Sequence, residues 1–281
     1  MKMTPFGGLP IEFTERATAK VAVVPTPFDG TSTWGKGADR GPRALLDASA
    51  NMELYDIETE SEPYKVGIFT SEPVCGADSE RNVNALERQV GELLDEGKFV
   101  VTLGGEHSIS TGPIRAHAKK YPEMSVLQLD AHTDLRDEYE GTPYNHACIM
   151  ARTLEVTDSV VSVGIRSMDT SELENAKKTT IFFAEQIHGR DDWHEKAIKG
   201  LRDNVYITVD LDVFDPSCLP STGTPEPGGM DWYSVTRFLA KVFRERNVVG
   251  FDVVELAPTS ERSSDFLAAK LVYKMLAYKF S

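Results

Sequence analysis

The sequence predicts an α/β protein in which helices cover both faces of a mostly parallel sheet of about eight strands. Short runs rich in β-branched residues alternate with amphipathic helical patterns along the chain, which is typical of parallel strands joined by crossover helices. No Ser/Gly-rich linker, repeat or low-complexity tract divides the 281 residues. One domain covering residues 1–281 is therefore the simplest interpretation.

Eight short apolar runs are the candidate strands. Their length and their content of Val, Ile, Phe and Thr favour strands over helices, and their continuous apolar character indicates burial on both faces. The runs are residues 21–24, 66–69, 99–103, 125–129, 159–163, 180–183, 206–209 and 248–253.

Three longer segments have helical periodicity. In residues 79–96 the apolar side chains fall on one face, and Ser79 is the candidate N-cap. Residues 231–246 follow the same spacing. Residues 261–279 carry more apolar side chains than one face needs, which predicts either a subunit interface or deep burial within the same chain.

Composition and charge restrict the class of protein. With 41% hydrophobic and 26% charged residues, the chain can form a sizeable core. Its formal net charge of −14 argues against nucleic-acid and anionic-membrane partners. The same charge mildly favours a cationic ligand, although an acidic surface is also common among cytoplasmic enzymes.

Cysteine content and the N-terminal residues indicate the compartment. Cys75, Cys148 and Cys218 are an odd number without CxxC spacing, so a disulfide framework is not expected. Residues 1–20 lack the apolar core of a signal peptide, and no apolar stretch approaches the ~20 residues that span a bilayer. We therefore expect a soluble, cytoplasmic protein.

Two carboxylate-rich clusters are the most informative feature of the chain. Asp130, His132 and Asp134 occupy alternate positions directly after one predicted strand, and Asp210 and Asp212 do so after another. Side chains two apart on a strand point the same way, so each cluster directs its polar groups to one point. Without a counter-charge these groups would repel and desolvate one another, which favours a cation between them over a purely structural role.

Polar residues also follow two other predicted strands. His107 comes shortly after the third strand and Glu255 shortly after the eighth. The carboxyl ends of parallel strands share one edge of a sheet, and small molecules and ions bind at that edge. A lone histidine is more often structural, but beside the carboxylate clusters His107 becomes a candidate metal ligand. The neighbouring pair Gly104 and Gly105 is either a simple turn or a close approach of the backbone to the site.

The other histidines and the tryptophans carry weaker signals. His146 begins a helical pattern that runs to Leu154, and it is either functional or a polar helix-start residue. The remaining histidines receive no chemical role, and the tryptophans are interpreted as packing residues. These are His117, His188 and His194, and Trp34, Trp193 and Trp232.

The combined donor set is that of a two-metal hydrolase. Four carboxylates offset two divalent cations, and oxygen donors with only two imidazoles suit Mn²⁺, although Fe, Co, Ni or Zn bind similar sets. Shared carboxylates would hold the ions about 3.5–4 Å apart and give a hydroxide near neutral pH. A phosphoesterase would use similar carboxylates, but the chain has no Gly-rich phosphate cradle or basic cluster.

Several segments together resemble the ureohydrolase family of arginases and agmatinases, and the agmatinase branch most closely. A stretch from Pro27 to Arg43 also matches, so the resemblance spans nearly the whole chain. Both carboxylate motifs and a Gly-Thr-Pro-Glu-Pro-Gly-Gly loop occur in the family's order, which is highly specific. The segments are residues 104–108, 130–134, 210–216, 223–229 and 252–255.

The resemblance implies a three-layer α/β/α fold around an eight-stranded parallel sheet, assembled as homotrimers or homohexamers, with two manganese ions per subunit. Two carboxylates would bridge the ions. By motif position, one ion would be held by His107, Asp130, Asp134 and Asp210, and the other by His132, Asp130, Asp210 and Asp212.

The resemblance also implies catalytic roles. Glu255 would pair with the guanidinium of the substrate, and Asp134 would orient the attacking metal-bridging hydroxide. His146 would contact the substrate and pass a proton to the leaving amine. The products would be urea and an amine, which is putrescine when the substrate is agmatine, as in polyamine biosynthesis.

The sequence departs from the arginases where the substrate tail would bind. Their polar loop for the amino-acid head group is replaced by residues 135–140, which carry three acids and favour a cationic tail. Asp169 is a candidate for binding the distal ammonium, whereas Arg136 favours a carboxylate-ended guanidine. Agmatine is the predicted substrate; the alternatives are 4-guanidinobutyrate, aminopropylagmatine, arginine, or a metal-binding regulator without activity.

Overall fold

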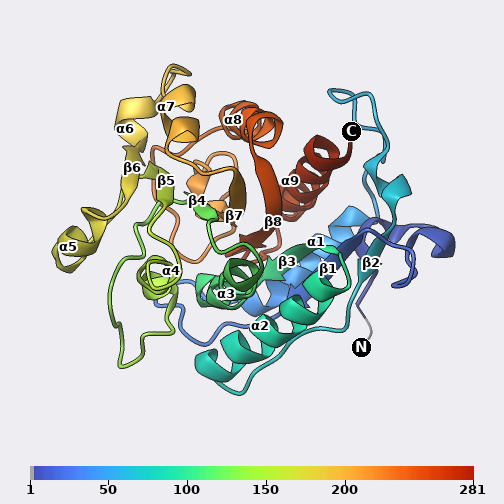
Figure 1. Ribbon diagram of the computed structural model, residues 1–281, viewed down its shortest axis with the longest axis horizontal. Coiled ribbons are helices and arrows are strands. Elements are labelled where there is room, and N and C mark those ends of the chain that lie inside the picture. Colours follow the sequence, from blue (N-terminus) through green and yellow to red (C-terminus); the bar gives the residue numbers. More distant parts are fainter. Residues whose placement is uncertain (1–2) are drawn as a thin grey trace.

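Eight parallel strands form one central sheet in the computed structural model, which describes residues 3–281 (Figure 1). The strand order is β2-β1-β3-β8-β7-β4-β5-β6, and every neighbouring pair is parallel. The predicted fold class is confirmed. The strands are β1 (Val21–Thr26), β2 (Ile68–Thr70), β3 (Phe99–Gly104), β4 (Ser125–Leu129), β5 (Val160–Ile165), β6 (Thr180–Phe183), β7 (Asn204–Asp210) and β8 (Asn247–Val254).

Helices cover both faces of this sheet and complete the three layers. Helices α1, α8 and α9 belong to the core cluster on one face, and α2, α3 and α4 belong to the two clusters on the other (Figure 1). The α-helices of the described residues are α1 (Gly41–Ser49), α2 (Ser79–Asp95), α3 (Thr111–Lys120), α4 (Ile149–Thr153), α5 (Leu173–Ala176), α6 (Ala184–Ile187), α7 (His194–Lys199), α8 (Trp232–Glu245) and α9 (Ser263–Phe280).

Each predicted strand corresponds to an observed strand, with differences at the ends. Residues 125–129 and 180–183 agree to the residue. The clearest shift is at residues 66–69, because Pro63–Val66 form a 3₁₀ turn and β2 begins at Ile68. Gly67, with a φ of 80°, changes the chain direction between them, and an apolar run alone does not reveal such a residue.

The prediction that Ser79 caps α2 was wrong by one residue. The cap is Asp78, whose carboxylate accepts a hydrogen bond from the backbone N–H of Arg81 at 2.8 Å, and Ser79 is the first helical residue. An N-cap oxygen accepts from the second or third N–H of the helix, and Arg81 is the third residue of α2.

Helix α9 is buried on several sides within its own chain. It packs against α1, α8 and β8, and side chains as far apart on its circumference as Leu271, Tyr273 and Met275 are fully buried. Deep burial therefore accounts for the excess of apolar residues in this helix. No subunit interface is needed to explain it.

The interpretation of the tryptophans as packing residues holds for Trp193, which is buried, and for Trp232, which packs against the core. It was wrong for Trp34, which is 82% exposed. Trp34 lies in an irregular loop fixed through the backbone of Gly35, whose N–H donates to Gly223, so packing of the indole is not required.

The three cysteines are unpaired, as expected. None of the helices in residues 3–281 has both the length and the apolar character to cross a membrane.

Candidate metal centre

Four neighbouring strands bring the candidate residues to one edge of the sheet. β3, β8, β7 and β4 lie side by side and are parallel, so their carboxyl ends meet. His107 comes shortly after β3, Asp130 directly follows β4, Asp210 is the last residue of β7, and Glu255 directly follows β8. The structure thus brings together the polar groups that the sequence placed at separate strand ends.

His107 is at the centre of the first ligand group. Its Nδ1 lies 3.2 Å from Asp130 Oδ2, 3.0 Å from Asp134 Oδ2 and 3.2 Å from Asp210 Oδ2. The imidazole and all three carboxylates are buried. Four potential donor atoms therefore surround one small volume that is closed to bulk water.

His132 is at the centre of a second group beside the first. Its Nδ1 lies 3.0 Å from Asp212 Oδ2 and 3.6 Å from Asp130 Oδ1. Asp130 thus presents one oxygen to each imidazole, as a bridging carboxylate would. Asp210 presents only one oxygen to the first group, because its Oδ1 accepts the N–H of Asp212 at 2.9 Å.

A chain of hydrogen bonds behind His107 fixes how this imidazole is presented. Thr208 donates its hydroxyl to Asp252 at 2.6 Å, so its oxygen accepts from His107 Nε2–H at 2.9 Å. Tyr206 donates to the other oxygen of Asp252 at 2.7 Å. With Nε2 carrying a hydrogen, Nδ1 turns its lone pair toward the three carboxylates. Partners of this kind orient metal-ligating histidines.

Nδ1 of His107 provides the test of whether a metal fits. It is buried, and it has no hydrogen-bond partner among the described residues although carboxylates surround it. Burial would lower the pKa of His107, but Asp130, Asp134 and Asp210 raise it well above its ordinary value, so this position attracts a positive charge. A divalent cation satisfies the lone pair and the carboxylates together.

The charges of the six residues do not balance within the protein. Burial raises the pKa of Asp134 to about 7, and repulsion from Asp130 adds to the effect. Burial also raises the pKa of Asp210 well above its ordinary value. Burial by itself would lower the pKa of His132, but the charges of Asp212 and Asp130 raise it to about 12. Two divalent cations would relieve this repulsion, so the residues fit a binuclear site.

Two site residues adopt a left-handed backbone that side chains rarely take. Asp134 has a φ of 51° and Glu255 a φ of 65°. Non-glycine residues in this region carry strain, and such residues cluster at functional sites. From this backbone Asp134 places Oδ2 3.0 Å from His107 Nδ1, whereas Glu255 accepts the backbone N–H of His107.

His146 lines two neighbouring cavities, which we call the inner and the outer cavity. The inner cavity is small and is lined by Gly35, Gly223 and Glu255 as well as His146. Burial lowers the pKa of His146 to about 4, so its ring is neutral at pH 7. Its Nδ1 lies 3.3 Å from Thr31 Oγ1, and its backbone N–H donates to the same oxygen at 3.0 Å.

Glu255 has one oxygen engaged and one directed at the inner cavity. Oε1 accepts the backbone N–H of His107 at 2.7 Å. Oε2 faces Gly223, where an added Cβ would lie 3.5 Å from it. Burial, followed by repulsion from Glu106, raises the pKa of Glu255 well above its ordinary value. A cation bound in this cavity would stabilise the ionised carboxylate.

The outer cavity has a volume of about 210 Å³ and contains Asp169. The side chain of Asp169 is 45% exposed, and its Oδ1 already accepts from the backbone and hydroxyl of Ser171 at 2.9 and 2.6 Å. Its Oδ2 lies 3.8 Å from Arg136. Asp169, the predicted tail-binding residue, thus lines the same cavity as His132 and Asp134, but its carboxylate already has Ser171 and Arg136 as partners.

Sequence reasoning missed the residues that hold the ligands in place. Thr208 bonds to His107 and Thr31 bonds to His146, while Asp252 acts through Thr208, and all three lie outside the alternating pattern. Arg166 was missed as well; it donates to the carbonyl oxygens of Asp212 at 2.6 Å and Glu226 at 2.9 Å. A buried Asp and Thr within apolar strands was the available signal for the first pair.

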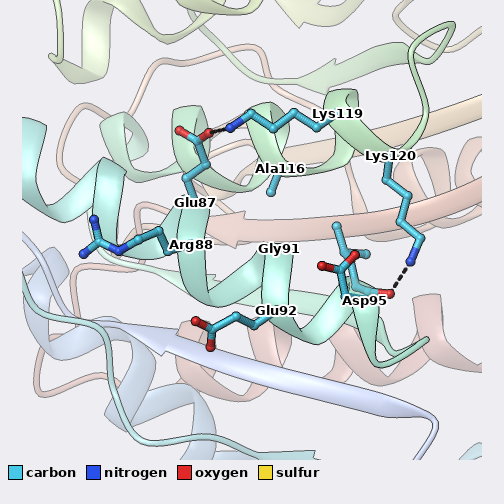
Figure 2. A pocket seen from close by; sticks show the side chains of 9 residues that line it. Glu87, Arg88, Gly91, Glu92, Asp95, Ala116, Lys119 and Lys120 are labelled. Carbon is cyan, nitrogen blue, oxygen red and sulfur yellow. Dashed lines mark hydrogen bonds and ion pairs between the residues drawn. The ribbon is translucent and has the colours of Figure 1, made fainter.

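A separate hollow between α2 and α3 has a different character (Figure 2). Figure 2 shows Lys119 paired with Glu87. Lys120 donates to the carbonyl oxygen of Leu94. The charged groups of this hollow belong to the solvated faces of α2 and α3. Neither of the two His/Asp groups that could hold a metal lies in the hollow. We assign it no function.

The chain matches known proteins over nearly its full length. A model of the Arginase family matches residues 19–277. An N(1)-aminopropylagmatine ureohydrolase from Synechocystis sp. is 38% identical over 279 residues, which cover 94% of this chain and 90% of the relative. An agmatinase from Bacillus anthracis is 33% identical over 273 residues, with 92% and 91% coverage.

Solved structures have the same architecture. The agmatine ureohydrolase of Thermoplasma volcanium aligns with a TM-score of 0.89 at 30% identity, over 99% of this chain and 95% of that chain. The proclavaminate amidino hydrolase of Streptomyces clavuligerus also aligns with a TM-score of 0.89, over 99% of this chain and 97% of that one. At 23% identity this second similarity shows the fold alone.

Proposed function

Because the chain belongs to the arginase family, we propose that this hydrolase binds two manganese ions and cleaves agmatine to urea and putrescine. The observation that carries the proposal is the pair of adjoining His/Asp groups, both of which include Asp130, at the edge of the sheet. The relatives named as ureohydrolases support hydrolysis of a guanidine as the reaction class.

We propose manganese as the metal from the character of the six candidate ligands. Oxygen donors with only two imidazoles suit manganese. Bound ions of this kind supply an activated water as nucleophile and stabilise negative charge as it develops on the substrate.

Glu255, Asp134 and His146 would act on the guanidinium. Glu255 Oε2 accepts hydrogen bonds from the guanidinium N–H groups, which fixes the plane of the substrate and stabilises its charge. Asp134 accepts a hydrogen bond from the attacking water. The attacking water would give up its proton to Asp134, and His146, neutral at pH 7 and held by Thr31, would accept this proton and pass it to the leaving nitrogen, so that C–N cleavage yields urea and a neutral amine.

A second candidate substrate is N1-aminopropylagmatine. The relative that is 38% identical carries this name, whereas the agmatinase reported above is 33% identical. Both substrates share the guanidinium end and a cationic tail, so they differ only in how far the tail extends from the outer cavity. 4-Guanidinobutyrate and arginine stay as alternatives with a carboxylate on the tail.

We also propose that the subunits assemble as homotrimers or homohexamers, which the family resemblance implies. Sedimentation equilibrium of the metal-loaded protein distinguishes the two assemblies and would reject the proposal if the protein were monomeric.

Urea release tests the function directly. Protein loaded with Mn²⁺, and the same protein after chelation, are assayed on agmatine, N1-aminopropylagmatine, 4-guanidinobutyrate and arginine, with metal content measured in parallel. The highest kcat/KM is expected for agmatine, with turnover lost on chelation. A protein that carries two ions per subunit and hydrolyses none of these compounds is a metal-binding regulator, and the proposed function is then wrong.

A further inference from the structure

Arg136 projects its own guanidinium into the outer cavity. The guanidinium carbon lies 4.4 Å from the centre of the Tyr139 ring, and Nη2 lies 3.8 Å from Asp169 Oδ2. All three residues line the cavity that also contains the metal-ligand candidates His132 and Asp134. An aromatic face opposite a carboxylate is the arrangement that binds an organic cation.

The walls of this arrangement are fixed without help from the Arg136 side chain. The backbone of Tyr139 pairs with Thr142 in both directions, at 3.1 and 3.2 Å. The backbone N–H of Asp169 donates to Glu172 Oε2 at 2.6 Å, and Glu172 Oε1 accepts the N–H of Leu135 at 2.8 Å. Glu172 therefore ties the segment that carries Asp169 to the loop that carries Tyr139.

Arg136 itself is held loosely. Its side chain is 28% exposed, and 3.8 Å is an ion-pair distance that is too long for a hydrogen bond. An ion pair of this length between partly exposed side chains and a single cation–π contact each contribute modestly. Apart from the metal-ligand candidates His132 and Asp134, the lining carries two carboxylates, Asp169 and Glu172, and one cation, Arg136, so the outer cavity keeps an attraction for a second cation.

We propose that Tyr139 and Asp169 form a subsite for the distal cation of the substrate, and that Arg136 occupies this subsite and is displaced by the tail. Selectivity between cationic and neutral tails is then set by competition between Arg136 and the tail. This inference rests on the proposed ureohydrolase function. It makes Arg136 a competitor of a cationic tail and not a partner for a carboxylate tail.

The substitution Arg136→Gln tests the competition. Agmatine is compared with n-butylguanidine, which has the same length but no distal ammonium, so the ratio of their KM values cancels effects on the shared guanidinium. We expect the ratio of the n-butylguanidine KM to the agmatine KM to rise about three- to tenfold, because the resident cation is gone. Arg136→Lys, which keeps a positive charge, should stay closer to the wild type.

Two further variants make the test independent of folding defects. Asp169→Asn keeps the helix cap and should lower the same ratio, which is the opposite sign. Arg115→Gln is the matched control, because Arg115 also stacks on a tyrosine, Tyr144, at 5.3 Å and pairs with Glu155 at 3.3 Å, but does not line the cavity. This control should leave the ratio unchanged.

An unchanged or lowered ratio in Arg136→Gln overturns the inference. So does a loss confined to 4-guanidinobutyrate, which would make Arg136 a partner for a carboxylate. If the wild type releases no urea from any guanidine, the proposed function has failed separately. In that case calorimetric titration with agmatine and n-butylguanidine gives the ratio of Kd values, and the same rise in Arg136→Gln is required.

Discussion

The two ring nitrogens of His107 have different partners, and the partner of one nitrogen determines what the other can bind. One nitrogen faces three carboxylates, and the other donates to Thr208, whose hydroxyl in turn donates to Asp252. Because Asp252 is fully buried, Thr208 cannot reverse its hydroxyl without taking the donor away from Asp252 Oδ1, which leaves Tyr206 to serve the other oxygen alone. The direction of the chain therefore determines which nitrogen of His107 is available to a metal.

Thr208→Val should weaken metal binding without removing a ligand. Valine keeps the shape of the side chain but deletes the hydroxyl, so the orientation of His107 is lost and Asp252 loses a donor. We expect manganese affinity to fall about 10- to 100-fold, measured as bound metal after dialysis against defined Mn²⁺ concentrations. Thr153→Val is the control, because Thr153 is also buried but its hydroxyl donates to the carbonyl oxygen of Ile149 within α4. Unchanged affinity in Thr208→Val would remove Thr208 from the site.

His117 gives the protein a pH dependence that is separate from the metal centre. Burial lowers its pKa to about 4 from an ordinary 6.5, although Nδ1–H donates to Pro113 at 2.7 Å. Between these values the unfolded chain binds a proton that the folded chain does not, so stability is complete above pH 6.5 and falls as the pH falls. At pH 4.5 the loss is about 2–3 kcal/mol.

The variant His117→Asn isolates this contribution. Asparagine has an N–H donor but no titrating group, so the free energy of unfolding should decline less steeply than in the wild type between pH 7 and pH 4.5. Denaturant titrations at several pH values measure the two slopes, and every other group is common to both proteins. Parallel slopes would show that His117 does not titrate in this range.

At the scale of elements, the turn after β3 depends on how closely it approaches the loop after β1. A Cβ built on Gly105 would lie 1.8 Å from the carbonyl oxygen of Phe28, and Gly105 N–H donates to Thr26 at 2.8 Å. Of the two interpretations of the glycine pair, the structure supports close backbone approach at Gly105. The loop that it touches also carries Thr31, which holds His146.

Gly105→Ala should therefore separate two loops of the site. The methyl group would collide with backbone, so we expect a loss of at least about 2 kcal/mol of stability together with reduced metal content. Gly91→Ala on α2 is the opposite control, because nothing lies within 4 Å of its Cβ position and alanine favours a helix by about 0.5–1 kcal/mol. Thermal unfolding and metal analysis of the pair provide the comparison.

The elements differ in how far the sequence reveals them. The strands were predictable because continuous apolar runs must be buried, and the alternation of Asp130, His132 and Asp134 directs attention to their ends. The left-handed backbone at Asp134 and the hydrogen bond between Thr31 and His146 were not predictable. The first depends on the surrounding packing, and the second joins residues 115 positions apart, which no local pattern encodes.

At the scale of the whole molecule, the four central strands gather carboxylates at one edge of a chain that already carries a net charge of −14. Burial and mutual repulsion raise the pKa values of Asp134 and Asp210, so each ionised carboxylate opposes folding unless a cation offsets it. The arrangement that favours metal binding therefore costs stability in the metal-free protein. Such a trade-off between function and stability is common at active sites.

Asp134→Asn should make the metal-free protein more stable than the wild type and the metal-loaded protein less stable than the wild type. Asparagine tolerates the φ of 51° and carries no charge, so in chelator the variant should be more stable than the wild type by about 1–2 kcal/mol, a rise in Tm of a few degrees. With Mn²⁺ the wild type should gain more, because each tenfold increase in free metal over Kd adds about 1.4 kcal/mol and the variant has lost a ligand. Scanning calorimetry in chelator and across a Mn²⁺ series measures both differences. If the variant melts below the wild type in chelator as well, Asp134 stabilises the fold by itself, and repulsion within the centre is not a cost that the metal offsets.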